Sequence, residues 1–185
     1  MNDFLKKLYD TKIPLSLLLM EAKEIAEING ENELVCYIDN EITGYKVEDK
    51  LPAYRILKGE IVCDIYNIYG ITVAKEHYVD FDALSDKIGF DLNAVHFVDD
   101  ISFIEATLKN ITGTTAIRPI HKEIVTMLGD VFHRSNPQHH LQAAYHKFPK
   151  STIEYIPTRV RLDVIQAFQN VIFFFVLATS RIMGI

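Results

Sequence analysis

The spacing of apolar residues changes near residue 52, and this change constrains the fold more than any other feature of the sequence. Over residues 15–25 and again over 34–42, apolar side chains recur every three or four positions, which places them on one face of a helix. Asn29-Gly30 separates the two segments and is expected to end the first helix. Over residues 57–65, apolar residues alternate with charged ones, which predicts a half-buried strand.

A partner strand is predicted in "GITVAKEHYVDF", with a hairpin turn over residues 67–70, and Gly59 is expected to mark a bulge. These segments predict an α+β fold in a single domain. The domain is expected to span residues 1–185, with an N-terminal helical hairpin at 14–44, a small antiparallel β-sheet at 53–81 and a helical C-terminal half at 82–185.

Helical patterns dominate the second half of the sequence. Asp100 is placed to cap a helix over residues 101–109, and Pro119 is expected to open the next helix. The histidine-rich stretch that follows is interpreted as a loop with a short helix at "HLQAAYH". A third strand is expected at "TIEYI", and Thr158, after Pro157, is expected to cap a long last helix.

The charge and cysteine content narrow the class of protein. The formal net charge is −6, which argues against nucleic-acid binding driven by the overall charge of the chain. The two cysteines, Cys36 and Cys63, are expected to be buried and unbonded. The first residues, "MNDFLKKLYD", lack the apolar core of a secretion signal, so a cytoplasmic location is expected.

The stretch "NEITGYKVEDKLPAYR", at residues 40–55, carries a family resemblance. A leucine-rich helix, a brief break and a second helix ending in Asn-Glu-x-x-Gly-Tyr precede a polar loop and Leu-Pro-x-Tyr-Arg. This pattern resembles the start of an AbiTii-type abortive-infection domain. The resemblance implies a bacterial anti-phage defence protein whose action arrests or kills an infected cell. The residues that carry it are Asn40, Glu41, Gly44, Tyr45, Leu51, Pro52, Tyr54 and Arg55.

The same residues also have a structural interpretation, which we favour. Gly44 suits the left-handed backbone position after a helix. Pro52 suits the beginning of a strand, on which Tyr54 and Arg55 would lie on opposite faces. Glu41 and Arg55 are expected to pair across the corner.

The histidine-rich stretch holds a candidate catalytic pair. Arg134 and His139 form an Arg-x4-His spacing that resembles the signature of HEPN ribonucleases, in which arginine stabilises phosphoryl charge and histidine moves a proton. Ser135 and Pro137 depart from that signature, which is helical and prefers a polar Asn, Asp or His after the arginine. The histidines lack a matched cysteine set or a His-Glu-x-x-His helix, so no metal site is predicted.

The end of the last helix is apolar on all sides over residues 171–178, "VIFFFVLA". Such a segment needs cover from the core, a partner chain or lipid, but it is shorter than the roughly 20 residues of a spanning helix. We therefore predict an association surface that includes Val171, Phe174, Phe175 and Ile182.

Three functions are consistent with these patterns, and none calls for a cofactor. The first is a defence module that acts by protein–protein association, as a homo-oligomer or with a partner from the same defence system. The second is a ribonuclease-type toxin that uses Arg134 and His139 on RNA. The third is an effector that perturbs a membrane through the apolar end of the last helix.

Overall fold

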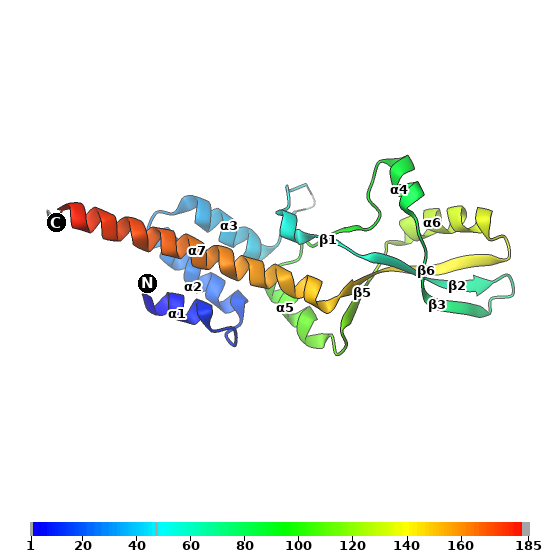
Figure 1. The fold of residues 1–185 in the computed structure, drawn as a ribbon, viewed down its shortest axis with the longest axis horizontal. Coiled ribbons are helices and arrows are strands. Elements are labelled where there is room, and N and C mark those ends of the chain that lie inside the picture. Colours follow the sequence, from blue (N-terminus) through cyan, green and yellow to red (C-terminus); the bar gives the residue numbers. More distant parts are fainter. Residues whose placement is uncertain (1, 47, 183–185) are drawn as a thin grey trace. The chain divides into compact units, whose positions relative to one another are not determined.

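The computed structural model describes residues 2–46 and 48–182, and it describes side-chain surroundings for residues 3–46 and 48–170. The chain packs as two compact units, each built from separate stretches of sequence (Figure 1). Unit 1 comprises Met1–Arg55, Val98–Asn110 and Ile153–Ile185, and unit 2 comprises Ile56–Phe97 and Ile111–Thr152. The prediction of a single domain stays a prediction.

Unit 1 is helical. Its elements are α1 (Asn2–Tyr9), α2 (Leu15–Ile28), α3 (Asn32–Thr43), the 3-10 turn η1 (Ala53–Arg55), α5 (Ile101–Asn110) and most of α7 (Lys150–Ile182). The predicted helical hairpin is present as α2 and α3, and Gly30 between them has a positive φ of 73°. Asp100 caps α5 as predicted, because its Oδ1 accepts the backbone N–H of Phe103 at 2.9 Å.

Helix α7 begins earlier than the sequence predicted. The strand expected at "TIEYI" and the cap expected at Thr158 are both wrong, because helix α7 starts at Lys150 and includes Pro157. The buried residues of this stretch recur at helical spacing, and their burial outweighs the roughly 3 kcal/mol that an interior proline costs. They are Ile153, Ile156, Val160, Val164 and Phe168.

Unit 2 is a sheet with two helices. A four-stranded antiparallel sheet has the order β3-β2-β6-β5, and a two-stranded sheet pairs β1 with β4. The elements are β1 (Ile56–Lys58), β2 (Glu60–Asn67), β3 (Thr72–Tyr78), α4 (Asp82–Ile88), β4 (Ala94–His96), β5 (Thr115–Pro119), α6 (Lys122–Ser135) and β6 (His139–Pro149). Helix α6 contributes Leu128 to a core shared with Ile61 and Cys63 of β2.

The histidine-rich stretch is a central strand, and its prediction as a loop with a short helix is wrong. Strand β6 pairs with β2 from Glu60↔Lys147 to Asn67↔His139 and with β5 on its other side. Two alanines and four histidines or lysines give this segment a weak intrinsic strand preference, so pairing on both sides decides its conformation.

Three local predictions need correction. Gly59 lies between β1 and β2 instead of at a bulge, and a Cβ added there would come within 2.6 Å of the Phe148 ring. Pro119 ends the edge strand β5, and α6 starts only at Lys122. The Cys36 side chain is exposed, whereas Cys63 is buried as expected.

The α+β class predicted from the sequence is confirmed, with helices at both ends of the chain and small antiparallel sheets between them. The part of the chain after residue 82 contains β4, β5 and β6 in addition to its helices. Among the described residues, no helix combines the length and apolar character needed to cross a membrane.

Candidate functional site

The corner that follows α3 is fixed by close backbone contact with the segment that leads into α5. The backbone N–H of Tyr45 donates to the carbonyl of Val98 at 2.8 Å. Gly44 has φ 81°, and a Cβ at this position would lie 2.8 Å from the same carbonyl oxygen. Only glycine meets both demands without strain, so Gly44 sets how the corner meets the start of α5.

The 3-10 turn η1 replaces the strand that was predicted to begin at Pro52. The backbone N–H of Arg55 donates to the carbonyl of Pro52 at 2.9 Å, and regular strand pairing starts only at Ile56. The tight turn brings Tyr54 and Arg55 to the same carboxylate, that of Glu41. The prediction that Tyr54 and Arg55 point to opposite faces of a strand is therefore wrong.

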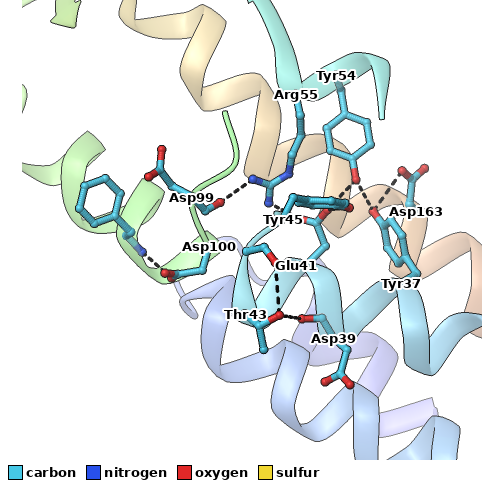
Figure 2. Close-up of polar contacts among 12 residues, drawn as sticks. Tyr37, Asp39, Glu41, Thr43, Tyr45, Tyr54, Arg55, Asp99, Asp100 and Asp163 are labelled. Carbon is cyan, nitrogen blue, oxygen red and sulfur yellow. Dashed lines mark hydrogen bonds and ion pairs between the residues drawn. The ribbon is translucent and has the colours of Figure 1, made fainter. Parts of the chain in front are cut away.

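Glu41 and Arg55 form a buried ion pair (Figure 2). Both side chains are 0% exposed, and Arg55 Nη2 donates to Glu41 Oε2. The other terminal nitrogen, Nη1, donates to the backbone carbonyl of Asp99 at 2.5 Å. The guanidinium carbon lies 4.9 Å from the ring centre of Tyr45, a cation–π distance. The expected pairing across the corner is thus present, and it joins α3, η1 and the start of α5.

Tyrosine hydroxyls complete the cluster. Tyr45 and Tyr54 both donate to Glu41 Oε1, at 2.7 and 2.8 Å. The Tyr37 hydroxyl lies 3.0 Å from that of Tyr54 and donates to Asp163 Oδ2 of α7 at 3.4 Å. Figure 2 shows this chain of hydroxyls running from the ion pair toward α7. We call these groups the carboxylate–tyrosine cluster, and its members are Tyr37, Glu41, Tyr45, Tyr54, Arg55 and Asp163.

The electrostatics of the cluster favour neutral phenols. Burial, as the main cause, raises the pKa of Tyr37, Tyr45 and Tyr54 above the ordinary value of a phenol, and the Glu41 charge raises it further in each case. The phenols therefore remain protonated near neutral pH and serve as hydrogen-bond donors. Each oxygen of the Glu41 carboxylate accepts from a side chain of the cluster, which is the arrangement of a structural clamp.

Sequence reasoning missed two members of the cluster. Tyr37 lies one helical turn before Glu41, so the four-residue spacing was the signal that places both on one face of α3. Asp163 lies 126 residues from Tyr37 and carries no local signal. Its carboxylate also binds Arg159 one turn earlier in α7, at 2.9 Å. Asn40, the first residue of the family pattern, is exposed on α3.

The candidate catalytic pair flanks the turn between α6 and β6. Arg134 is exposed in the last turn of α6, and His139 is the half-buried first residue of β6. The two residues therefore do not share a helix, unlike the ribonuclease signature. The neighbouring His133 places Nδ1 3.0 Å from the carbonyl of His139. A hollow of about 450 Å³ between α6 and β6 is lined by His133 and His140, but by neither member of the predicted pair. The catalytic role of Arg134 and His139 stays a prediction.

A second hollow, of about 550 Å³, lies in unit 1 beside the loop between α1 and α2. Two of the charged side chains that line it, Arg161 and Glu105, bind backbone groups of the unit. Arg161 donates to the carbonyls of Leu8, Asp10 and Ile13 at 2.7–3.2 Å. Glu105 accepts the N–H groups of Leu15 and Ser16 and so satisfies the first turn of α2. These charges fasten the helices of unit 1 to one another.

Helix α2 buries one face and carries exposed apolar residues on the other, where Glu21, Glu24 and Glu27 also lie. Its inner face buries Leu15, Leu18, Leu19, Ala22 and Ala26. On its outer side, Leu17, Met20 and Ile28 are 60%, 56% and 84% exposed. The association residues predicted at Val171, Phe174, Phe175 and Ile182 lie outside the residues whose side chains are described, so they stay a prediction.

Comparison with known proteins identifies a family. The family model AbiTii matches residues 1–170, a range that runs through both compact units and extends well beyond the corner stretch that suggested the resemblance. Searches of the curated proteins and of the solved structures found no match. The chain therefore belongs to the AbiTii family, which ties it to abortive infection, a form of anti-phage defence.

Proposed function

We propose that this AbiTii protein acts in bacterial anti-phage defence by protein–protein association, with a second copy of the chain as its partner and the outer face of α2 as the contact. The observation that carries the proposal is the exposure of Leu17, Met20 and Ile28 on a helix whose opposite face is already buried.

An exposed apolar row is costly unless something covers it. The three residues lie on one side of α2, with Leu17 and Met20 one turn apart near its start and Ile28 at its end; Glu24 lies between them on the same side. Exposed apolar side chains that group on a protein surface mark interaction sites, and Leu17 and Met20 form such a group one turn apart. Unit 1 presents this row while its own core is complete on the other side of α2.

The arrangement of the carboxylate–tyrosine cluster supports association over chemistry at the corner that follows α3. Glu41 and Arg55 neutralise each other, and the neighbouring phenols are held in their neutral form. Such a cluster fixes the positions of α3, η1 and α5 relative to one another. A contact surface on unit 1 is therefore carried by a rigid set of helices.

Size-exclusion chromatography with light scattering tests the proposal on the full chain. We expect a mass above that of a monomer, and Leu17→Lys should weaken the assembly. Burial of one such side chain contributes about 1.5–3 kcal/mol, so the dissociation constant should rise roughly tenfold to a hundredfold. Leu162→Lys, at an exposed leucine of α7, is the matched control and should leave the mass unchanged. A monomer at high concentration, or equal dissociation by both variants, would contradict the proposal.

A ribonuclease toxin is the second candidate, because Arg134 and His139 flank one turn and are both accessible to solvent. Expression of the wild-type chain should then arrest growth and cleave RNA. His139→Ala should abolish both effects at an unchanged protein level. Toxicity that survives this substitution would rule out the assignment of His139.

A further inference from the structure

One end of the four-stranded sheet carries an apolar segment beside a polar one, and neither contains an acidic residue. It consists of the turn between β2 and β3 with the adjoining strand ends, residues 66–73, and the turn between α6 and β6 with the adjoining element ends, residues 134–140. We call this surface the sheet tip. The backbone N–H of Ile68 donates to the carbonyl of Gln138 at 3.2 Å, which joins the two turns. The Tyr66 and His140 rings stack with centroids 6.1 Å apart. Both turns lie at the same end of the sheet in Figure 1.

The exposed side chains of the first turn are mainly aliphatic. Tyr69 is 81% exposed and Ile71 is 63% exposed, and Ile68 and Val73 are also more than half exposed. Backbone and side-chain bonds fix this turn, since Asn67 Oδ1 accepts the N–H groups of Tyr69 and Ile71 at 3.0 Å. The turn is therefore an ordered surface that presents apolar groups to solvent, which marks a site of interaction.

The charge around the tip differs from that of the whole chain. The sequence carries 25 acidic residues and a net charge of −6, yet neither residues 65–75 nor residues 131–153 contain an Asp or a Glu. The second turn instead contributes Arg134 with His139 and His140. An anionic surface can approach this end of the sheet without repulsion from a carboxylate of either segment.

Strand addition does not explain the surface. Strand β3 is the sheet edge, but its pairing with β2 shifts register twice within seven residues. Glu76, at the shift between Ala74 and His77, has φ 46°. Bulges of this kind twist an edge away from further pairing. Single-stranded nucleic acid is also a poorer fit, because it is held by several aromatic rings and a row of cations, whereas the exposed residues of the turn are mostly aliphatic.

We propose that the sheet tip binds the surface of an anionic lipid membrane. Ile68, Tyr69 and Ile71 enter the boundary between headgroups and acyl chains, where aliphatic side chains lose contact with water and a tyrosine keeps its hydroxyl among polar groups. Arg134 meets the lipid phosphates. This contact involves no residue of α2. A failure of the proposed association through α2 would therefore leave the membrane proposal unaffected, and the reverse also holds.

Vesicle flotation of the full chain tests the proposal. The wild type should float with vesicles of phosphatidylcholine and phosphatidylglycerol. Ile71→Ser and Tyr69→Ser should each reduce the bound fraction about tenfold or more, since burial of one large apolar side chain shifts an equilibrium by at least that factor. Arg134→Gln should weaken binding about fivefold. Ile88→Ser, at an exposed apolar residue of α4, is the control and should bind as the wild type does.

Circular dichroism should show that all four variants keep the wild-type fold. The proposal is overturned if the wild type does not float, if it binds pure phosphatidylcholine vesicles equally well, or if Ile88→Ser loses as much binding as Ile71→Ser. Binding of single-stranded RNA that depends on Tyr69 and Ile71, without flotation, would assign the tip to RNA and overturn it as well.

Discussion

The buried ion pair of Glu41 and Arg55 supports the sharpest prediction from the structure. Arg55→Met keeps much of the side-chain volume and removes the charge. Within the described part of the chain, the Glu41 carboxylate then stays fully buried with the hydroxyls of Tyr45 and Tyr54 as its remaining side-chain donors. Removal of one partner from a buried pair costs about 3–5 kcal/mol, because the other charge is left uncompensated. A typical domain has a total stability of only about 5–15 kcal/mol.

Urea unfolding followed by far-UV circular dichroism measures this loss, and the chain offers a matched control. With a denaturant slope of about 2 kcal/mol per molar, the midpoint should fall by roughly 1.5–2.5 M in Arg55→Met. Arg159→Met breaks a pair with Asp163 in which the arginine side chain is 46% exposed. Such exposed pairs contribute about 0–1 kcal/mol, so this midpoint should move little.

The stability of the double variant Glu41→Gln, Arg55→Met, compared with that of each single variant, gives a stricter check. Glu41→Gln removes the charge that Arg55→Met leaves behind, so the double variant should be more stable than Arg55→Met alone. The reasoning would be refuted if the double variant lost the sum of the two single losses. It would be refuted equally if Arg55→Met came within about 1 kcal/mol of Arg159→Met.

Three further predictions follow from local geometry. Gly44→Ala should lower the free energy of unfolding more than Gly30→Ala. Both glycines have positive φ, but of the two only a Cβ at Gly44 would meet a backbone atom, at 2.8 Å. Equal losses of stability in urea unfolding would contradict this. Above about pH 10 the unfolded state releases phenolic protons before the folded state, since burial raises the folded pKa of Tyr37. Stability should therefore fall as pH rises, by up to about 1.4 kcal/mol per pH unit for each such phenol, and Tyr37→Phe should make the decline seen in pH-dependent melting less steep. In native protein a thiol reagent should label the exposed Cys36 rapidly, while Cys63, whose pKa burial raises to about 12, should react only on unfolding; mass spectrometry of labelled peptides checks both.

The sequence predicted those elements whose cause is local. The α2–α3 hairpin follows from helical spacing and a glycine break, and the cap of α5 follows from one aspartate before an apolar run. The β2–β3 hairpin follows from alternation on both sides of a turn. In each case the residues that specify the element lie within it or beside it.

The misses share a physical cause, which is pairing or packing with distant residues. Strand β6 gains its conformation from β2 and β5, and the start of α7 depends on burial of its apolar face in spite of Pro157. Of the candidate site, the pairing of Glu41 with Arg55 was predicted because both lie in one short corner. The link from Tyr37 to Asp163 was not predictable, because it closes across 126 residues.

Phage plating on cells that carry the protein tests the central claim most directly, because the claim is that defence depends on association through the outer face of α2. Plating efficiency should be low with the wild type and with Leu162→Lys, and it should rise to that of unprotected cells with Leu17→Lys at an equal protein level. Full protection by Leu17→Lys would contradict the account.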